Sequence, residues 1–225
     1  VGENEYEWTD NKELQRKLVM NTVTKDFTLT SSYLTYSPVV SRQNLPDIEQ
    51  AKKEAVTFLE TLGSYPDTIN EASTAAQFLA IQNGELVEAS SLSSAQIIRF
   101  DFYPQVVDQL PIYFPNSPRS LIYVMLGGGL NNLTVVEAKF NNQEISQDFS
   151  DYPTKTAQAA FAELEAGRGY IASYFGNSTD IKIQNISLGY YLGEDVQEYL
   201  MPIIVFEGND GFLAYVSAVQ DNFIE

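Results

Sequence analysis

The stretch MPIIVFEGNDGFLAYV, residues 201–216, carries the clearest fold signal in the chain. Two runs rich in β-branched, aliphatic and aromatic residues, Tyr199–Phe206 and Phe212–Val219, flank the sequence Gly208-Asn209-Asp210-Gly211. Glycine, asparagine and aspartate suit tight turns between strands, because they tolerate positive φ. The stretch therefore predicts an antiparallel hairpin.

The same order of elements occurs earlier in the chain. Each half contains an aromatic extended run, a polar stretch, a proline-marked strand and an apolar strand. The matching pairs are Ile98–Tyr103 with Ile186–Tyr191, Leu110–Phe114 with Met201–Phe206, and Leu121–Val124 with Leu213–Val216. The match predicts an internal repeat, with Pro111 and Pro202 at strand beginnings, where a missing N–H is tolerated.

A helix is predicted before each of these sets of strands. Asp47 can cap the first helix, Gln50 completes a capping box, and Gly63 supplies a left-handed end. The second follows Tyr152-Pro153, with Thr154 or Thr156 as its cap and Gly167 as its end. Between the first helix and the strands, Asn83-Gly84 predicts a tight hairpin turn.

These elements predict an α+β protein of two similar units, each a helix packed on an antiparallel β-meander, preceded by an N-terminal strand-rich segment. The expected segments are 1–45, 46–150 and 151–225. The first is interpreted as the end of a truncated unit, because Tyr6 and Trp8 already stand at strand spacing just after Val1. We expect a preceding part that could hold an anchor.

Composition excludes several functions. Thirty acidic and 13 basic residues leave a net charge of −17, which repels phosphate backbones and anionic lipid. Nucleic-acid binding is therefore not expected. Direct membrane insertion by this fragment is not expected either, since no run of 18 apolar residues exists. Without cysteine or histidine, the usual zinc, haem and iron–sulfur ligands and the usual triad base are missing. No cofactor or metal is predicted.

Residues 188–216 carry a resemblance to known proteins. The pattern Leu188-Gly-Tyr190-Tyr191, then Tyr199-Leu-Met-Pro202, then Gly211-Phe-Leu-Ala-Tyr215 resembles the C-terminal pattern of bacterial YycH/YycI regulatory proteins and of PepSY-like repeats. It covers mainly residues 150–220. The resemblance implies an extracytoplasmic helix-and-sheet module without catalytic activity of its own. Such modules are often membrane-anchored, and some restrain sensor kinases or proteases. The N-terminal strands and the glycine-rich hairpin depart from the pattern.

Several residues invite a chemical interpretation. Asp101 and Asp108 are the candidate acids for a carboxylate-based hydrolase, but strand alternation favours a solvent-facing Asp101. Gly127-Gly128-Gly129 precedes a strand, which favours a flexible hairpin connection over a phosphate loop. Two stretches offer oxygen ligands for calcium, but they lack the spacing of an EF-hand loop, and ordinary turn chemistry explains both. These ligands are Asp148, Ser150 and Asp151, and separately Asn209 and Asp210.

Tyrosines gather in the matching strands of both halves. Such rings can fill a helix–sheet core or form a face that binds a peptide or a sugar by stacking, and we favour the core. The residues assigned to a possible binding surface are Tyr103, Tyr113, Tyr190, Tyr191 and Tyr199.

The leading prediction is a non-catalytic extracytoplasmic module, anchored through a segment absent from this chain, that binds or regulates an envelope protein or peptide. One alternative is a carboxylate-based hydrolase acting on carbohydrate. Another is a structural or assembly protein that pairs through exposed sheet edges. The oligomeric state stays open.

Overall fold

The structure is a computed structural model that describes residues 4–42, 45–65, 67–129, 133–146 and 148–223. It contains two compact units: Val1–Tyr103 with Leu121–Asn142, and Pro104–Ser120 with Gln143–Glu225. These units cut across the segments expected from the sequence. The strands within residues 5–30 share a sheet with later strands, and residues 104–120 belong with the C-terminal part.

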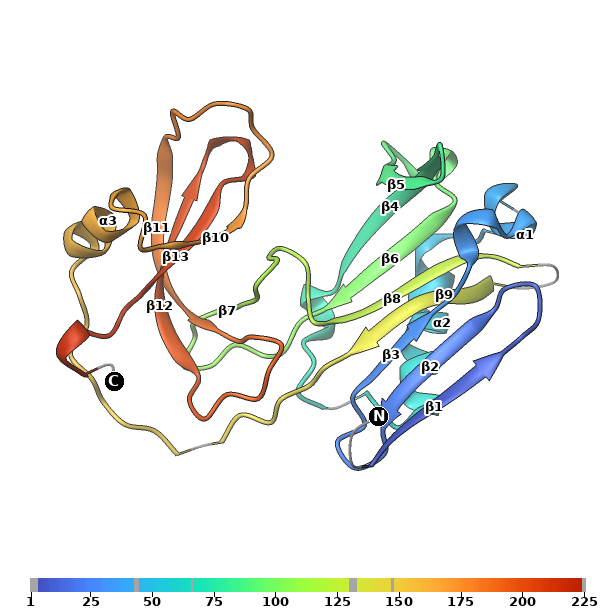
Figure 1. Cartoon of the computed structure of the whole chain (residues 1–225), viewed down its shortest axis with the longest axis horizontal. Helices are drawn as coiled ribbons and strands as arrows, with labels where there is room; N and C mark the ends of the chain where they lie inside the picture. The colour runs from blue at the N-terminus through green and yellow to red at the C-terminus, as the bar shows by residue number, and fades with distance from the viewer. Residues whose placement is uncertain (1–3, 43–44, 66, 130–132, 147, 224–225) are drawn as a thin grey trace. The chain divides into compact units, whose positions relative to one another are not determined.

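The first unit is built on an eight-stranded antiparallel sheet (Figure 1). Its order is β1 (Glu5–Asp10), β2 (Arg16–Asn21), β3 (Phe27–Thr30), β9 (Leu133–Phe140), β8 (Ile122–Gly128), β6 (Ile97–Phe102), β4 (Ala75–Gln82) and β5 (Glu85–Glu88). The turn between β4 and β5 has positive φ at both Asn83 and Gly84, as the Asn-Gly pair predicts.

Helix α2 (Ile48–Thr61) covers one face of this sheet. Asp47 caps it, with the Gln50 N–H donating to the carboxylate at 2.9 Å, and Gly63 follows at a φ of 68°. Ala55 and Leu59 are fully buried against apolar side chains of the central strands. The cap, the buried helix face and the glycine end are all confirmed.

The opposite face of the sheet is covered by the short helix α1 (Ser37–Val40). Val39 is fully buried there, and a Cβ built on Gly127 would lie 2.8 Å from a Val39 methyl group. Gly127 and Gly128 are therefore strand residues of β8 and not only a flexible connection, as the sequence had suggested. Gly127 is needed because the helix lies directly on the strand backbone.

The described residues of the second unit form a five-stranded sheet and one α-helix (Figure 1). The order is β10 (Tyr170–Ser173), β13 (Leu213–Ser217), β12 (Met201–Gly208), β11 (Ile183–Tyr191) and β7 (Ile112–Tyr113). Helix α3 (Ala157–Glu165) is capped by Thr156, which accepts the Ala159 N–H at 3.2 Å. It packs on β12 and β13 through Ala160, Phe206 and Val216.

Short 3₁₀ segments complete the described chain: η1 (Tyr33–Thr35), η2 (Glu71–Ser73), η3 (Leu92–Ser94), η4 (Asn209–Gly211) and η5 (Asp221–Phe223). Within η4, Asp210 and Gly211 have φ values of 53° and 68°. The predicted hairpin turn between β12 and β13 is therefore confirmed. Among the described residues, no helix has the length and apolar character needed to cross a bilayer.

The α+β class is confirmed, with a helix on a mainly antiparallel sheet in each unit. The residue match of the repeat is wrong at Leu110–Phe114. This run contains only the two-residue β7, which joins the second sheet parallel to β11, whereas Met201–Phe206 lies in the central strand β12. Two local causes prevent a longer strand here. The backbone has positive φ at Asp108 and Gln109, and Pro111 has no N–H to donate to a neighbouring strand.

Candidate functional site

Two of the five selected tyrosines come together on one face of the second sheet. Tyr113 and Tyr191 lie 5.5 and 6.1 Å, ring centre to ring centre, from Tyr215. Tyr170 stacks on Tyr215 at 6.1 Å. Tyr215 is only 3% exposed and donates its hydroxyl to the Phe114 carbonyl at 3.2 Å. At the centre of this cluster the rings are core side chains.

The other three selected tyrosines lie elsewhere. Tyr103 belongs to the first unit. Tyr190 is next to Tyr191 on β11, so its side chain leaves the opposite face of the strand. Tyr199 precedes β12 and is 62% exposed. The five therefore do not form one continuous surface of the second sheet.

Asp101 is buried, which corrects the expectation that it faces solvent. Its side chain is 7% exposed and accepts two hydrogen bonds from Arg99, at 2.8 Å from Nη2 and 2.9 Å from Nε. The guanidinium also lies over the Tyr123 ring, 3.7 Å from its centre. Strand alternation failed as a guide because β6 is a central strand that is buried on both faces.

A second carboxylate on the same face of this sheet, that of Glu137, is also held by hydrogen bonds. Glu137 accepts hydrogen bonds from the hydroxyls of Tyr123, at 2.8 Å, and Tyr33, at 3.1 Å. Burial, and then the Glu137 charge, raises the pKa of both tyrosines. The two acids are held in structural contacts, so they offer no specific support for the hydrolase alternative.

Two half-buried tyrosines make the fold sensitive to alkali. Burial and the Asp101 charge raise the pKa of Tyr103 to about 12, and burial and Glu71 raise the pKa of Tyr65 to about 12. An unfolded chain releases these protons near pH 10. Because the folded state binds them more tightly, we expect stability to be complete below about pH 10 and to fall as pH rises towards about 12.

Urea unfolding at a series of alkaline pH values, with tyrosinate absorbance followed in parallel, checks this prediction. The double variant Tyr103→Phe with Tyr65→Phe should show a shallower loss of stability over the same pH window. Equal pH dependence in the variant and the unchanged chain would contradict it.

In the two polar stretches considered as calcium sites, side-chain groups form hydrogen bonds within the protein. The Asn209 side chain accepts the Lys182 N–H at 2.6 Å and donates to Asp210 at 2.7 Å. Asp148 pairs with Ser146 through its backbone N–H and its carboxylate. Within the residues that the structure describes, no group of three or more acidic, cysteine or histidine side chains could hold a metal.

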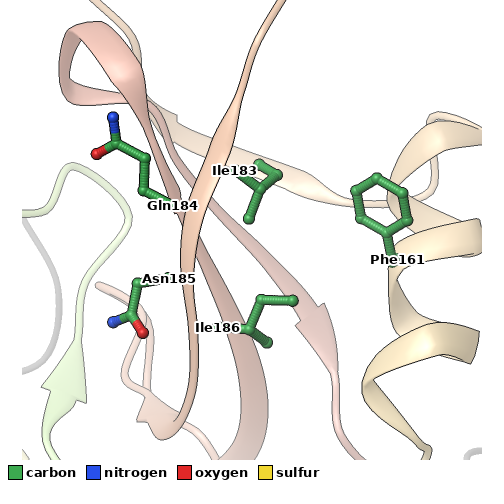
Figure 2. Close-up of a pocket in the computed structure, with 5 residues that line it drawn as sticks. All are labelled: Phe161, Ile183, Gln184, Asn185 and Ile186. Atoms are coloured by element: carbon green, nitrogen blue, oxygen red, sulfur yellow. The ribbon is translucent and has the colours of Figure 1, made fainter.

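A hollow of about 400 Å³ lies between α3 and β11. Figure 2 shows Ile183 and Ile186 pointing towards Phe161, whereas Gln184 and Asn185 point the other way. None of these five lining residues is charged. The hollow can therefore accept an apolar group but presents no acid–base pair.

The apolar surface continues from this hollow along β11. Ile186 and Leu188 are 44% and 45% exposed, although their partners on β12, Phe206 and Ile204, are almost fully buried beneath α3. Tyr190 follows two residues later on the same face, half-buried, with burial and then Asp108 raising its pKa. We call Ile186, Leu188 and Tyr190 the β11 row.

The row is uncovered because α3 is short. With nine residues the helix spans about 14 Å, and its buried side chains rest on β12 and β13. The sequence alternation Ile186-Ser-Leu188-Gly-Tyr190 contained a signal for this face. It could not show that the face lacks a cover, because this depends on where the helix ends over the sheet.

Comparisons with known proteins add little to this description. No protein-family model and no curated protein matches the sequence. The C-terminal domain of Bacillus megaterium YpeB is a similar solved structure, with 12% identity and a TM-score of 0.37 over 96% of this chain and 84% of that chain. A likeness at this TM-score supports no conclusion about the site or its ligand.

Proposed function

We propose that this chain is a non-catalytic, extracytoplasmic binding module that holds a protein partner on the β11 row and in the hollow beside α3. The observation that supports the proposal most directly is the exposure of Ile186 and Leu188 next to an apolar hollow. Isolated exposed apolar residues are common on proteins, but a continuous row next to a hollow is typical of an interaction site.

Hydrophobic burial would supply the binding energy at this face. Complete burial of an aliphatic side chain contributes about 1.5–3 kcal/mol, and half of each side chain is already covered. Ile186 and Leu188 would therefore contribute modestly by themselves, and a stable complex needs contacts beyond them. The net charge of −17 favours a partner whose surface is basic or neutral.

The extracytoplasmic setting is the part of the proposal that rests on sequence alone. It is supported by the resemblance of residues 188–216 to envelope regulatory proteins. Cell fractionation of the natural full-length protein tests it directly. Recovery of the protein with the cytosolic fraction would contradict the setting without affecting the binding face.

Site-specific photo-cross-linking tests the binding face. A photoreactive amino acid at Leu188 should produce one defined adduct in cells, whose partner can be identified by mass spectrometry. The matched control places the same group at Ile171, which is 57% exposed on β10, the edge strand on the opposite side of the same sheet. Adding Ile186→Asp should reduce the Leu188 adduct at least about tenfold, since a charge would face the apolar contact.

Identical adducts from positions 188 and 171, or no adduct from either, would contradict the proposed face. An adduct at 188 that survives Ile186→Asp unchanged would show that the apolar row does not bind the partner.

A further inference from the structure

The backbone of β11 has a free outer edge beside the exposed row. The N–H groups of Tyr190 and Leu192 point away from β12, because they donate to Pro111 and Tyr113 at 2.9 Å each. In an antiparallel ladder, every second residue turns both its N–H and its C=O to the same side. Ile186 and Leu188 therefore direct their backbone groups outward, and no described residue bonds to them there.

The chain itself already adds a strand to this edge. Strand β7 pairs with β11 in parallel, but only at Tyr190 and Tyr191. The pairing ends at Pro111, which has no N–H, and the positive φ values of Asp108 and Gln109 turn the chain away. The part of β11 before Tyr190 is thus the unfilled continuation of an edge that accepts a strand.

We propose that the partner binds by strand addition: an extended segment pairs with the outer edge of β11 and becomes a sixth strand of this sheet. This inference rests on the proposed function and specifies its ligand. The segment carries apolar side chains at alternate positions, with basic or polar side chains between them.

The alternation follows from the faces of the sheet. Ligand residues directly opposite Ile186 and Leu188 would share their face, cover the β11 row and reach towards the hollow. The intervening ligand residues would share the face of Asn185 and Ser187. On that face the Glu207 carboxylate accepts the Asn185 side-chain N–H at 3.0 Å, so a basic side chain is favoured there.

A second copy of this chain is a less favourable occupant. Antiparallel pairing of two β11 edges would satisfy the same backbone groups and bring two apolar rows together. It would also join two molecules that each carry a charge of −17. A basic, apolar segment satisfies the edge and the charge together, whereas a second copy satisfies only the edge.

Amide hydrogen exchange of the full chain tests this inference. The probe is a blocked synthetic peptide in which leucine alternates with lysine and threonine, and its control has the same composition with the leucines grouped together. The alternating peptide should slow exchange at the Ile186 and Leu188 amides, and the control peptide should not. Slowing by both peptides, or by neither, would overturn strand addition.

Two variants separate the backbone from the side chain. Leu188→Pro removes both the leucine side chain and an outward N–H that the β11–β12 ladder does not use, whereas Leu188→Ala shortens the side chain and keeps the N–H. Leu188→Pro should therefore weaken peptide binding about tenfold more than Leu188→Ala. Val196→Pro, at a 92% exposed residue outside the strands, is the matched control and should leave binding unchanged. Unfolding curves of these variants verify that the fold is retained.

The outcomes distinguish strand addition from the proposed function. If Leu188→Asp abolishes peptide binding but Leu188→Pro binds the peptide as tightly as Leu188→Ala, the face binds its partner without strand pairing, and this inference alone fails. If the cross-link from position 188 is also absent, both fail. Protection of the two amides that rises with protein concentration, together with a dimer in sedimentation, assigns the edge to a second copy and overturns a peptide ligand.

Discussion

Replacing Asp101 by alanine is expected to lower the free energy of unfolding by about 3–5 kcal/mol, because it leaves the Arg99 guanidinium charged and buried. The side chains of this pair are 8% and 7% exposed, and two hydrogen bonds join them. Urea denaturation followed by circular dichroism measures the change.

An exposed ion pair in the same sheet provides the matched control. Lys17 and Glu7 lie 2.9 Å apart, with side chains 49% and 40% exposed. Water screens this pair, so Glu7→Ala should cost no more than about 1 kcal/mol. The double variant Arg99→Met with Asp101→Leu should recover most of the stability lost in Asp101→Ala, since it removes both buried charges. A loss for Asp101→Ala as small as that for Glu7→Ala would contradict this account.

Replacing Phe206 by alanine is also expected to cost about 3–5 kcal/mol, because it opens a cavity beneath α3. Phe206 is fully buried, and its ring centre lies 6.1 Å from that of Phe161 beside the hollow. Urea unfolding measures the loss of stability. Amide hydrogen exchange of β12, followed at increasing urea concentrations, assigns this loss to the second unit. The same variant should weaken partner binding, since Phe161, which lines the hollow, would lose the ring against which it packs.

Phe149→Ala makes the same chemical change at a side chain that is 85% exposed. It should alter stability by less than about 0.5 kcal/mol. Equal losses for the two phenylalanines would mean that Phe206 does not support the helix–sheet contact.

Local features of the fold were predictable because their causes lie within a few residues. Asp47 and Thr156 accept N–H groups three residues ahead, so the caps follow from short-range geometry. Asn83-Gly84 and Gly208–Gly211 form turns that depend on positive φ, which their own residue types permit. The α+β class follows from these helices and turns together with the alternating strands.

Features that depend on distant partners were not predictable. Asp101 lies between Phe100 and Phe102, in the apolar–polar alternation that is typical of a half-exposed strand. Its side chain is nevertheless buried, because α1 and α2 cover both faces of the sheet that contains it. Leu110–Phe114 has the composition of a central strand, yet only two of its residues pair, and they do so in the other unit. The selected tyrosines separated for the same reason, since Tyr103 belongs to the first unit and Tyr113 joins the second sheet through β7.

The amino-acid sequence alone determined the helix ends, the turns, the α+β class and the acidity of this protein. Each of these depends on the chemistry of neighbouring residues or on simple sums over the chain. Only the tertiary structure decided which strands lie at edges and which apolar residues stay uncovered. Ile186 and Ile204 are the same residue type on adjacent strands. Ile204 is buried because α3 covers it, whereas Ile186 is exposed because α3 ends before it covers that residue.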